Sequence, residues 1–245
     1  MNGRMLRELE LAEVYALVKG AGAEGRKGEG DRDENDSIAQ APSSATSLLS
    51  PPPLRPSAPS PSTLSWSELR SAVSTCVACG LCRGRKQAVF GVGAEQGPWL
   101  FVGEGPGADE DEKGEPFVGQ AGKLLDSMLA AAGLQRGRDA YIANVVKCRP
   151  PGNRTPTPEE AAACAPFLDR QIDLVAPKVI VALGKTAAAH LLATDASVGS
   201  MRGKVHDYRG RPVVVTYHPA YLLRNLPDKA KAWEDLLFAR RVFAG

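Results

Sequence analysis

The sequence has no long apolar run, and its charges nearly cancel. No stretch approaches the roughly 20 apolar residues that cross a bilayer, and the first residues lack the basic, apolar and small segments of a signal peptide. We therefore expect a cytoplasmic protein with no membrane partner. The 30 basic side chains exceed the 28 acidic ones by so little that net charge alone does not indicate a nucleic-acid partner. Residues 66–245 carry about +4, which permits a polyanionic partner.

The chain has five cysteines, and an odd number fits a set of disulfides poorly in a reducing compartment. Cys76 and Cys79 form a C-x2-C pair, and Cys148 and Cys164 lie further along the chain. A pair on one helix and two distant thiolates can close a four-cysteine metal site. Cys82 competes for one of the four positions, because it extends the pair to a C-x2-C-x2-C run. Spacing alone does not separate zinc from iron–sulfur, and unligated buried cysteines are a further alternative.

Residues 1–64 form a tail whose composition differs from that of the remaining chain. Met5–Val18 could form a short amphipathic helix that docks a protein partner, and a solvated segment is the simpler interpretation. Between Ala41 and Ser62 the chain holds seven prolines and seven serines. This mixture cannot bury enough apolar surface to offset the entropy of ordering it, so we predict a disordered tail.

Strand and helix patterns alternate through residues 65–245. Capping boxes at Ser65 and Thr157 predict helices toward Cys76 and to about Val175. Other helices are expected over Gln120–Ala132, from Lys185, and over Asp228–Phe243, and strands over Leu100–Val102, Tyr141–Val146, Val179–Leu183 and Val213–Thr216. Strands separated by such helices predict a three-layer α/β/α fold with a central four-stranded parallel sheet.

Three segments follow the carboxyl ends of these strands, where open parallel sheets bind their ligands. The first is a glycine-rich loop that has neither the lysine of a Walker loop nor the glycine spacing of a dinucleotide fingerprint. Its acidic run, Asp109–Glu112, could bind a metal, and a solvated turn is the simpler interpretation. Asn144 lies at the second segment, where its amide either caps a turn or faces a polar ligand. His218 directly follows the fourth strand, where a histidine is either structural or functional.

Six short motifs occur in order along these segments. They are GEGPG at 103–107, ED at 110–111, PFVG at 116–119, Asn144, KCRPP at 147–151 and HPAYLLRN at 218–225. Together with the paired cysteines they resemble the iron–sulfur, family 4 uracil-DNA glycosylases. The likeness extends from about Cys76 to the C-terminus and covers nothing before Ser65.

The resemblance implies that residues 65–245 form a catalytic domain for DNA repair. Such a domain flips uracil out of DNA and hydrolyses the N-glycosidic bond, leaving an abasic site. The resemblance further implies a [4Fe-4S] cluster, held by Cys76, Cys79, Cys148 and Cys164, with Cys82 as a spare. Because the cluster would join segments far apart in sequence, a structural role is favoured. We expect a monomer that acts on uracil-containing DNA.

The resemblance also assigns roles to residues in the three segments. Phe117 would stack on the flipped base, and Asn144 would match the N3 donor and O4 acceptor of uracil. His218 would donate to O2 as the uracil anion forms, aided by the backbone N–H groups of Glu104 and Gly105. The remaining roles are exclusion of thymine at its C5 side by Glu110 and contact with DNA by Leu222, Leu223 and Arg224.

Two departures from related branches bear on the mechanism. Gly105 stands where the wider superfamily often carries an aspartate that positions the attacking water, so the resemblance assigns no general base. The loop 149–154 has no histidine, unlike a related branch that traps uracil covalently, which favours turnover. Two alternatives are a catalytically silent DNA-binding module with a structural cysteine–metal site, and a metal-dependent nuclease that uses Asp109–Glu112.

Overall fold

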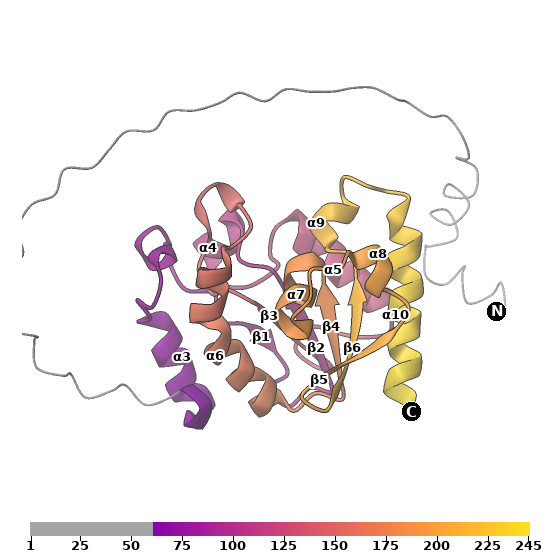
Figure 1. Ribbon diagram of the computed structural model, residues 1–245, viewed down its shortest axis with the longest axis horizontal. Coiled ribbons are helices and arrows are strands. Elements are labelled where there is room, and N and C mark those ends of the chain that lie inside the picture. Colours follow the sequence, from indigo (N-terminus) through magenta and orange to yellow (C-terminus); the bar gives the residue numbers. More distant parts are fainter. Residues whose placement is uncertain (1–60) are drawn as a thin grey trace, which may run out of the picture.

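The computed structural model describes residues 61–245 (Figure 1). These residues form a mixed sheet that is covered by helices. The predicted tail helix and nearly all of the predicted linker lie outside these residues. Among the described helices, none is both long and apolar enough to cross a membrane.

The sheet has six strands in the order β1-β3-β2-β4-β6-β5. Its four central strands are parallel and confirm the predicted sheet: β2 (Trp99–Gly103), β3 (Ala140–Asn144), β4 (Val179–Leu183) and β6 (Arg211–Thr216). The second strand ends at Asn144 and not at Val146, which corrects the predicted range. β3 and β4 pair with opposite edges of β2, so the order in which strands are added to the sheet reverses at β2. Open sheets of this kind bind their ligands at such a switch point.

Two short strands at the sheet edges were not predicted. β1 (Val92–Gly93) pairs antiparallel with β3, and β5 (Val205–Tyr208) pairs antiparallel with β6. β1 is only two residues long, and β5 alternates exposed with partly buried residues. Neither strand carries the apolar run by which a buried strand is recognised.

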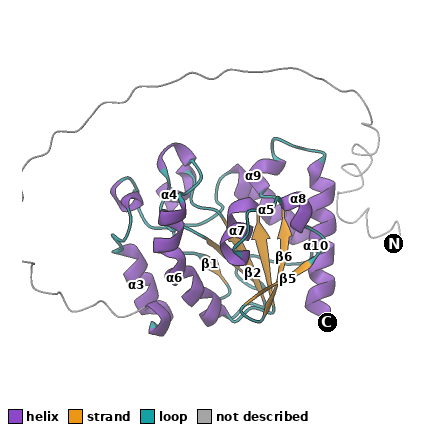
Figure 2. Ribbon diagram, viewed as in Figure 1, coloured by secondary structure: helices purple, strands orange, loops and turns teal. Residues whose placement is uncertain are grey.

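Helices pack on both faces of the sheet, as Figure 2 shows. One face is covered by α3 (Trp66–Ser74), α6 (Pro158–Val175) and α7 (Lys185–Leu192), and the other by α5 (Gln120–Ala131) and α10 (Asp228–Ala244). These confirm the predicted helices. The short helices α4 (Ala108–Lys113), α8 (Val198–Met201) and α9 (Pro219–Leu222) lie in the connections, with 3-10 turns at Pro61–Thr63, Gly80–Arg83 and Pro151–Asn153.

Two apolar cores follow from the alternation of side chains along each strand. Leu100 and Val102 of β2 pack in the core that α3, α6 and α7 cover, whereas Trp99 and Phe101 face α5 and α10. Every residue of β2, β3 and β4 is buried, as strands covered on both faces must be. The strands therefore form a rigid base, and their carboxyl ends are held in place.

Caps set the start of the helices that carry site residues. Thr157 accepts a hydrogen bond from the backbone N–H of Glu160, whose carboxylate accepts from the N–H of Thr157. This capping box begins α6 where the sequence predicted it and places Cys164 on its second turn. Ser65 and Glu68 begin α3 in the same way. Leu64 already packs in the core, one residue before the predicted domain start.

A buried polar contact fixes the carboxyl end of β6. Thr216, the last residue of that strand, donates its hydroxyl to Asp235 of α10 at 2.8 Å. Asp235 also accepts from the Nε of Arg202 at 3.1 Å, so its buried charge is paired. The strand end from which residues 217 and 218 continue is thus held by α10.

Candidate functional site

The three predicted segments meet at the carboxyl ends of the parallel strands. They border one open cleft of about 1320 Å³. The first turns of α6 and residues of α7 extend its lining beyond the segments that the sequence singled out, which are residues 103–119, 144–156 and 217–225. Of the predicted site residues, the cleft is lined by Glu104, Gly105, Glu110, Phe117, Asn144, His218 and Arg224. The fold therefore brings together residues more than 100 positions apart.

Asn144 lies at the floor of this cleft with an unused acceptor. Its side chain is 2% exposed, and its Oδ1 is the one buried side-chain nitrogen or oxygen of residues 61–245 without a hydrogen-bond partner. A Cβ on Gly103 would lie 2.5 Å from that oxygen and 2.6 Å from the ring of Phe117. Only a glycine at position 103 lets the amide of Asn144 and the ring of Phe117 lie side by side. Since buried polar groups are nearly always paired, this oxygen is suited to a donor on a ligand.

Phe117 and His218 form the aromatic part of the cleft. Their ring centroids are 5.5 Å apart, with planes tilted by 32°. Gly184 packs against the backbone side of this pair, because a Cβ there would approach the Cβ of His218 to 2.9 Å. A flat, partly apolar ligand can lie against these rings while its polar edge meets Asn144.

The His218 ring is neutral in the folded protein. Burial and the positive charge of Arg224 lower its pKa to about 4, although the carboxylate of Glu110 acts in the opposite direction. Its Nδ1 accepts a hydrogen bond from the backbone N–H of Ala220 at 3.1 Å. The proton of the neutral ring is therefore on Nε2, which can donate to a ligand.

The glycine-rich turn after β2 is held against the turn after β3. The carbonyl of Gly103 accepts from the N–H of Val145, and that of Glu104 accepts from the N–H of Val146. The carboxylate of Glu104 accepts a hydrogen bond from the hydroxyl of Thr186 on α7. A Cβ on Gly105 would lie 2.8 Å from Val146, so a larger side chain needs a shift of this turn.

The acidic run does not form a metal site. Glu110 accepts hydrogen bonds from the backbone N–H groups of Gly107, Val118 and Gly119. Asp111 is buried and accepts from the N–H of Lys86. Within the described chain, no group of three or more histidine, cysteine or acidic side chains is arranged to hold a metal ion. The carboxylates of Glu110 and Asp111 are thus engaged with the loops around them, and their arrangement does not support the metal-binding interpretation.

The loop after β6 differs in part from the expectation. Leu222 is 1% exposed, so it anchors the loop to the core and cannot contact a duplex in this conformation, which corrects its predicted role. Leu223 is 40% exposed and Arg224 is exposed beside it. Leu226, which the sequence did not single out, is 57% exposed. Its place directly after the motif at 218–225 is the sequence signal that could have found it.

All five cysteines line a second, small cavity between α3, α6 and the turn after β3. Cys148 and Cys164 are buried, whereas Cys76, Cys79 and Cys82 are partly buried. Arg85 donates from Nη1 to the Sγ of Cys148 at 3.0 Å. Burial raises the pKa of the Cys148 thiol above its ordinary value, although the charge of Arg85 opposes this shift. Burial also raises the pKa of the Cys164 thiol, to about 11. The five thiols do not converge as ligands of a single metal ion. The cavity that they line together, with the adjacent cation of Arg85, is the feature that suits a larger, anionic iron–sulfur cluster.

Comparisons with known proteins agree with this site. A family model described as "Uracil DNA glycosylase superfamily" matches residues 90–237. The chain is 51% identical to a type-4 uracil-DNA glycosylase of Thermotoga maritima over 161 residues, 65% of this chain and 83% of the relative. It is 46% identical to one of Archaeoglobus fulgidus, covering 62% and 79%, and 32% identical to a type-5 enzyme of Thermus thermophilus, covering 60% and 84%.

The protonation of His218 gives a test of the site's electrostatics. We expect its ring to stay neutral, as the Nε2–H tautomer, until the pH approaches 4, because burial and Arg224 disfavour the charged form. The unfolded chain would take up this proton near pH 6.5. The ring's contribution to stability should therefore decrease as the pH falls from about 6.5 to 4. Nitrogen NMR of the labelled ring measures both the tautomer and the pKa.

Two charge variants complete that measurement. Arg224→Gln should raise the pKa of His218, whereas Lys178→Gln removes an exposed cation beside the first residue of β4 and should leave it unchanged. A ring that titrates near 6.5 in the wild-type protein would contradict the neutral assignment.

Proposed function

The chain belongs to the type-4 uracil-DNA glycosylases, and we propose how its cleft carries out the reaction of that family. The enzyme acts in base excision repair, where it hydrolyses the N-glycosidic bond of uracil in DNA. The observation that supports this cleft as its active site is the unpaired Oδ1 of Asn144, buried beside Phe117 and His218. The product is an abasic site.

Base recognition is the first task of the cleft. Uracil must leave the stacked duplex, at a cost of about a few kcal/mol that contacts with the extruded base offset. Phe117 stacks on the ring, and Asn144 uses both ends of its amide. Its Oδ1 accepts from N3–H of uracil, and its Nδ2 donates to O4. Cytosine presents an acceptor and a donor at these positions and is therefore rejected.

Stabilisation of the leaving group is the second task. As the N-glycosidic bond breaks, negative charge develops on the uracil anion, largely at O2. Neutral His218 donates its Nε2–H to that oxygen, and the backbone N–H groups of Glu104 and Gly105 add to this. One preorganised donor of this type is worth about 3 to 4 kcal/mol in the transition state. A water molecule then forms a bond to C1′ of the sugar and loses its proton to solvent, because position 105 carries no aspartate to accept it.

The crowded position of Gly105 supports a reaction without that aspartate. A side chain there would contact Val146, whose N–H is bonded to the carbonyl of Glu104. Loop 149–154 holds no histidine of the kind that the covalent, uracil-trapping branch carries. Both features favour release of the product and repeated turnover.

Glu110 shapes the wall of the base pocket. Its carboxylate accepts three backbone N–H groups, two of them directly after Phe117. We assign to this fixed wall the exclusion of the thymine methyl group at C5. Because the carboxylate is held by the protein, the wall is rigid and does not adapt to the larger base.

DNA contact falls to the exposed part of the loop after β6. Leu223 fills the space that the flipped base leaves, and Arg224 binds phosphate. Leu226 is exposed on the same loop and adds apolar surface. Leu222 supports these residues from the core.

Cys76, Cys79, Cys148 and Cys164 would hold a [4Fe-4S] cluster, which when bound supplies a cross-link between segments far apart in the sequence. The cysteine-lined cavity and the hydrogen bond from Arg85 support this proposal. Cys82 lines the same cavity and stays a spare in our assignment. Hydrolysis requires no electron transfer, so we propose a structural role. We also propose a cytoplasmic monomer whose tail, residues 1–64, could bind a protein partner.

The two alternative functions predict different products. A silent DNA-binding module would leave DNA intact, and a nuclease that uses Asp109–Glu112 would need a metal ion, for which the described acidic residues form no site. We expect the protein to make a uracil-containing oligonucleotide alkali-labile at the uracil position, equally with and without EDTA. His218→Ala should lower the single-turnover rate by about 10²- to 10³-fold, since a transition-state donor is lost. Strand breakage before alkali treatment, stopped by EDTA, would identify a nuclease.

Asn144→Asp tests base selection. The change removes the amide donor and leaves an acceptor that suits the amino group of cytosine. Each mismatched buried polar group costs about 1 to 3 kcal/mol. We expect a large fall in uracil excision and a narrower uracil-to-cytosine ratio, with cytosine excision favoured at low pH, where the carboxyl group protonates. Single-turnover assays on matched oligonucleotides measure the ratio, and an unchanged ratio would make Asn144 a structural residue.

Cysteine variants test the cluster. Anaerobically purified protein should be brown, with broad absorption near ~400 nm and about four irons per chain. Cys148→Ala should lose iron and thermal stability, whereas the matched variant Cys82→Ala should keep both. A colourless protein with one zinc would contradict the cluster, and loss of iron in Cys82→Ala would contradict the choice of ligands.

A further inference from the structure

The backbone of Phe117 is held in a conformation that aromatic residues rarely adopt. Its φ is +56°, in the left-handed region. Asn153, which also lines the cleft, has a similar φ, but asparagine adopts this region readily. A strained residue at a functional site persists only if its surroundings hold it. The groups that hold Phe117 therefore control where its ring lies.

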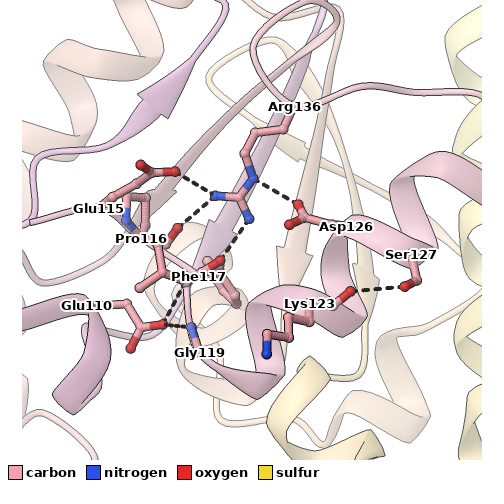
Figure 3. Close-up of polar contacts among 10 residues, drawn as sticks. Glu110, Glu115, Pro116, Phe117, Gly119, Lys123, Asp126, Ser127 and Arg136 are labelled. Carbon is pink, nitrogen blue, oxygen red and sulfur yellow. Dashed lines mark hydrogen bonds and ion pairs between the residues drawn. The ribbon is translucent and has the colours of Figure 1, made fainter. Parts of the chain in front are cut away.

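The side chain of Arg136 donates hydrogen bonds directly to the backbone of this segment (Figure 3). It lies between α5 and β3, and its side chain is 18% exposed. Nη1 donates to the carbonyl of Pro116 at 2.8 Å, and Nη2 donates to the carbonyl of Phe117 at 2.9 Å. Its guanidinium thus joins two consecutive carbonyls and fixes the relative orientation of the two peptide planes that flank the Cα of Phe117.

The guanidinium is itself fixed by two carboxylates. Nε donates to Asp126 of α5 at 2.8 Å, and Nη1 lies 3.4 Å from Glu115. Asp126 sets the orientation of the planar group, so that both Nη atoms face the carbonyls. Figure 3 shows Arg136 between Asp126 and the segment 115–117.

Glu110 and Gly122 also restrain the backbone around Phe117. Glu110 accepts from the N–H groups of Val118 and Gly119. A Cβ on Gly122 of α5 would lie 1.8 Å from the carbonyl oxygen of Phe117, so that carbonyl packs directly on the helix backbone. The Phe117 peptide is therefore enclosed between α5, Arg136 and the hydrogen bonds that follow it.

Arg136 does not line the cleft, although its contacts end at a residue that does. A direct contact with the flipped base is therefore absent, and its influence must pass through the backbone of Phe117. That backbone places the ring 5.5 Å from His218 and against Gly103, where the base is bound.

We infer that Arg136 is a positioning residue for base recognition: its guanidinium holds Phe117 in the left-handed conformation that turns the ring toward the flipped base. The inference rests on the proposed stacking role of Phe117. Arginine is required because one planar group must serve two carbonyls and two carboxylates at once, which the single ammonium of lysine does only in part.

The test compares Arg136→Gln and Arg136→Lys with the matched control Arg138→Gln. Arg138 lies two positions away, is exposed, and pairs with its neighbour Asp139. Three quantities are measured for each variant: the single-turnover rate on a uracil-containing duplex, the inhibition constant of free uracil, and the affinity for a duplex without uracil. Thermal unfolding shows that each variant is folded.

We expect Arg136→Gln to lower the single-turnover rate by about 10- to 100-fold, because a displaced contact of about 1 Å can cost that much. The inhibition constant of uracil should rise about 5-fold or more, since stacking of the base is lost. Affinity for uracil-free DNA should stay within about threefold, because that surface is untouched. Arg136→Lys should recover part of both losses, and Arg138→Gln should match the wild-type protein.

A double-mutant cycle with Phe117→Ala distinguishes positioning from a general loss of structure. If Arg136 acts through the ring, Arg136→Gln should lower the rate of Phe117→Ala by no more than about twofold. Asp126→Asn provides a milder variant, which loosens the guanidinium and should give an intermediate loss if Arg136→Gln does not fold.

Three results would overturn the inference. Full single-turnover rates in Arg136→Lys and Asp126→Asn would show that the guanidinium is not needed. Additive losses in the cycle would show that Arg136 acts independently of the ring. A wild-type rate in Phe117→Ala would refute the stacking role itself, and this result separates failure of the proposed function from failure of the positioning role alone.

Discussion

Lys147 is 1% exposed, and its buried amine links the two sites, because it lines the cysteine cavity and contacts the backbone of Asn144 in the cleft. It donates to the main-chain carbonyl of Asn144 at 2.8 Å and to the side-chain carbonyl of Gln171 on α6 at 2.5 Å. Burial lowers its pKa to about 8. Gln171 in turn donates to the carbonyl of Phe90 and to the hydroxyl of Tyr141. An uncompensated buried charge is costly, so these partners must stay in place together.

The same short turn carries residues of two sites. Asn144 faces the cleft, and Cys148, four residues later, lines the cysteine cavity. Lys147 lies between them and lines that cavity too. A displacement at the cysteine cavity therefore reaches the Asn144 amide through Lys147 and four residues of backbone. The proposed cluster site and the proposed base-binding amide thus follow the same strand end.

The cleft combines polar groups that have hydrogen-bond partners within the protein with one that has none. The carboxylates of Glu110 and Glu104 are occupied by hydrogen bonds within the protein, whereas Asn144 keeps a free acceptor within the described chain. His218 is kept neutral, with Nδ1 accepting from the backbone N–H of Ala220, so its Nε2–H stays available to one acceptor. Preorganised groups of this kind need no rearrangement when charge develops on the leaving base.

Local features of the sequence predicted the four central strands, the main helices and most of the cleft, because periodicity, caps and motifs act over a few residues. Tertiary packing alone decided the rest. The edge strand β5 lacks an apolar run and forms by pairing with β6, and Leu222 reads as an exposed loop residue but packs into the core. Arg136 lies 19 positions from Phe117 in the sequence, and only the packing of α5 brings its guanidinium to that carbonyl. No local sequence pattern predicts the contact between Arg136 and the Phe117 carbonyl, because it forms only when the fold brings the two residues together.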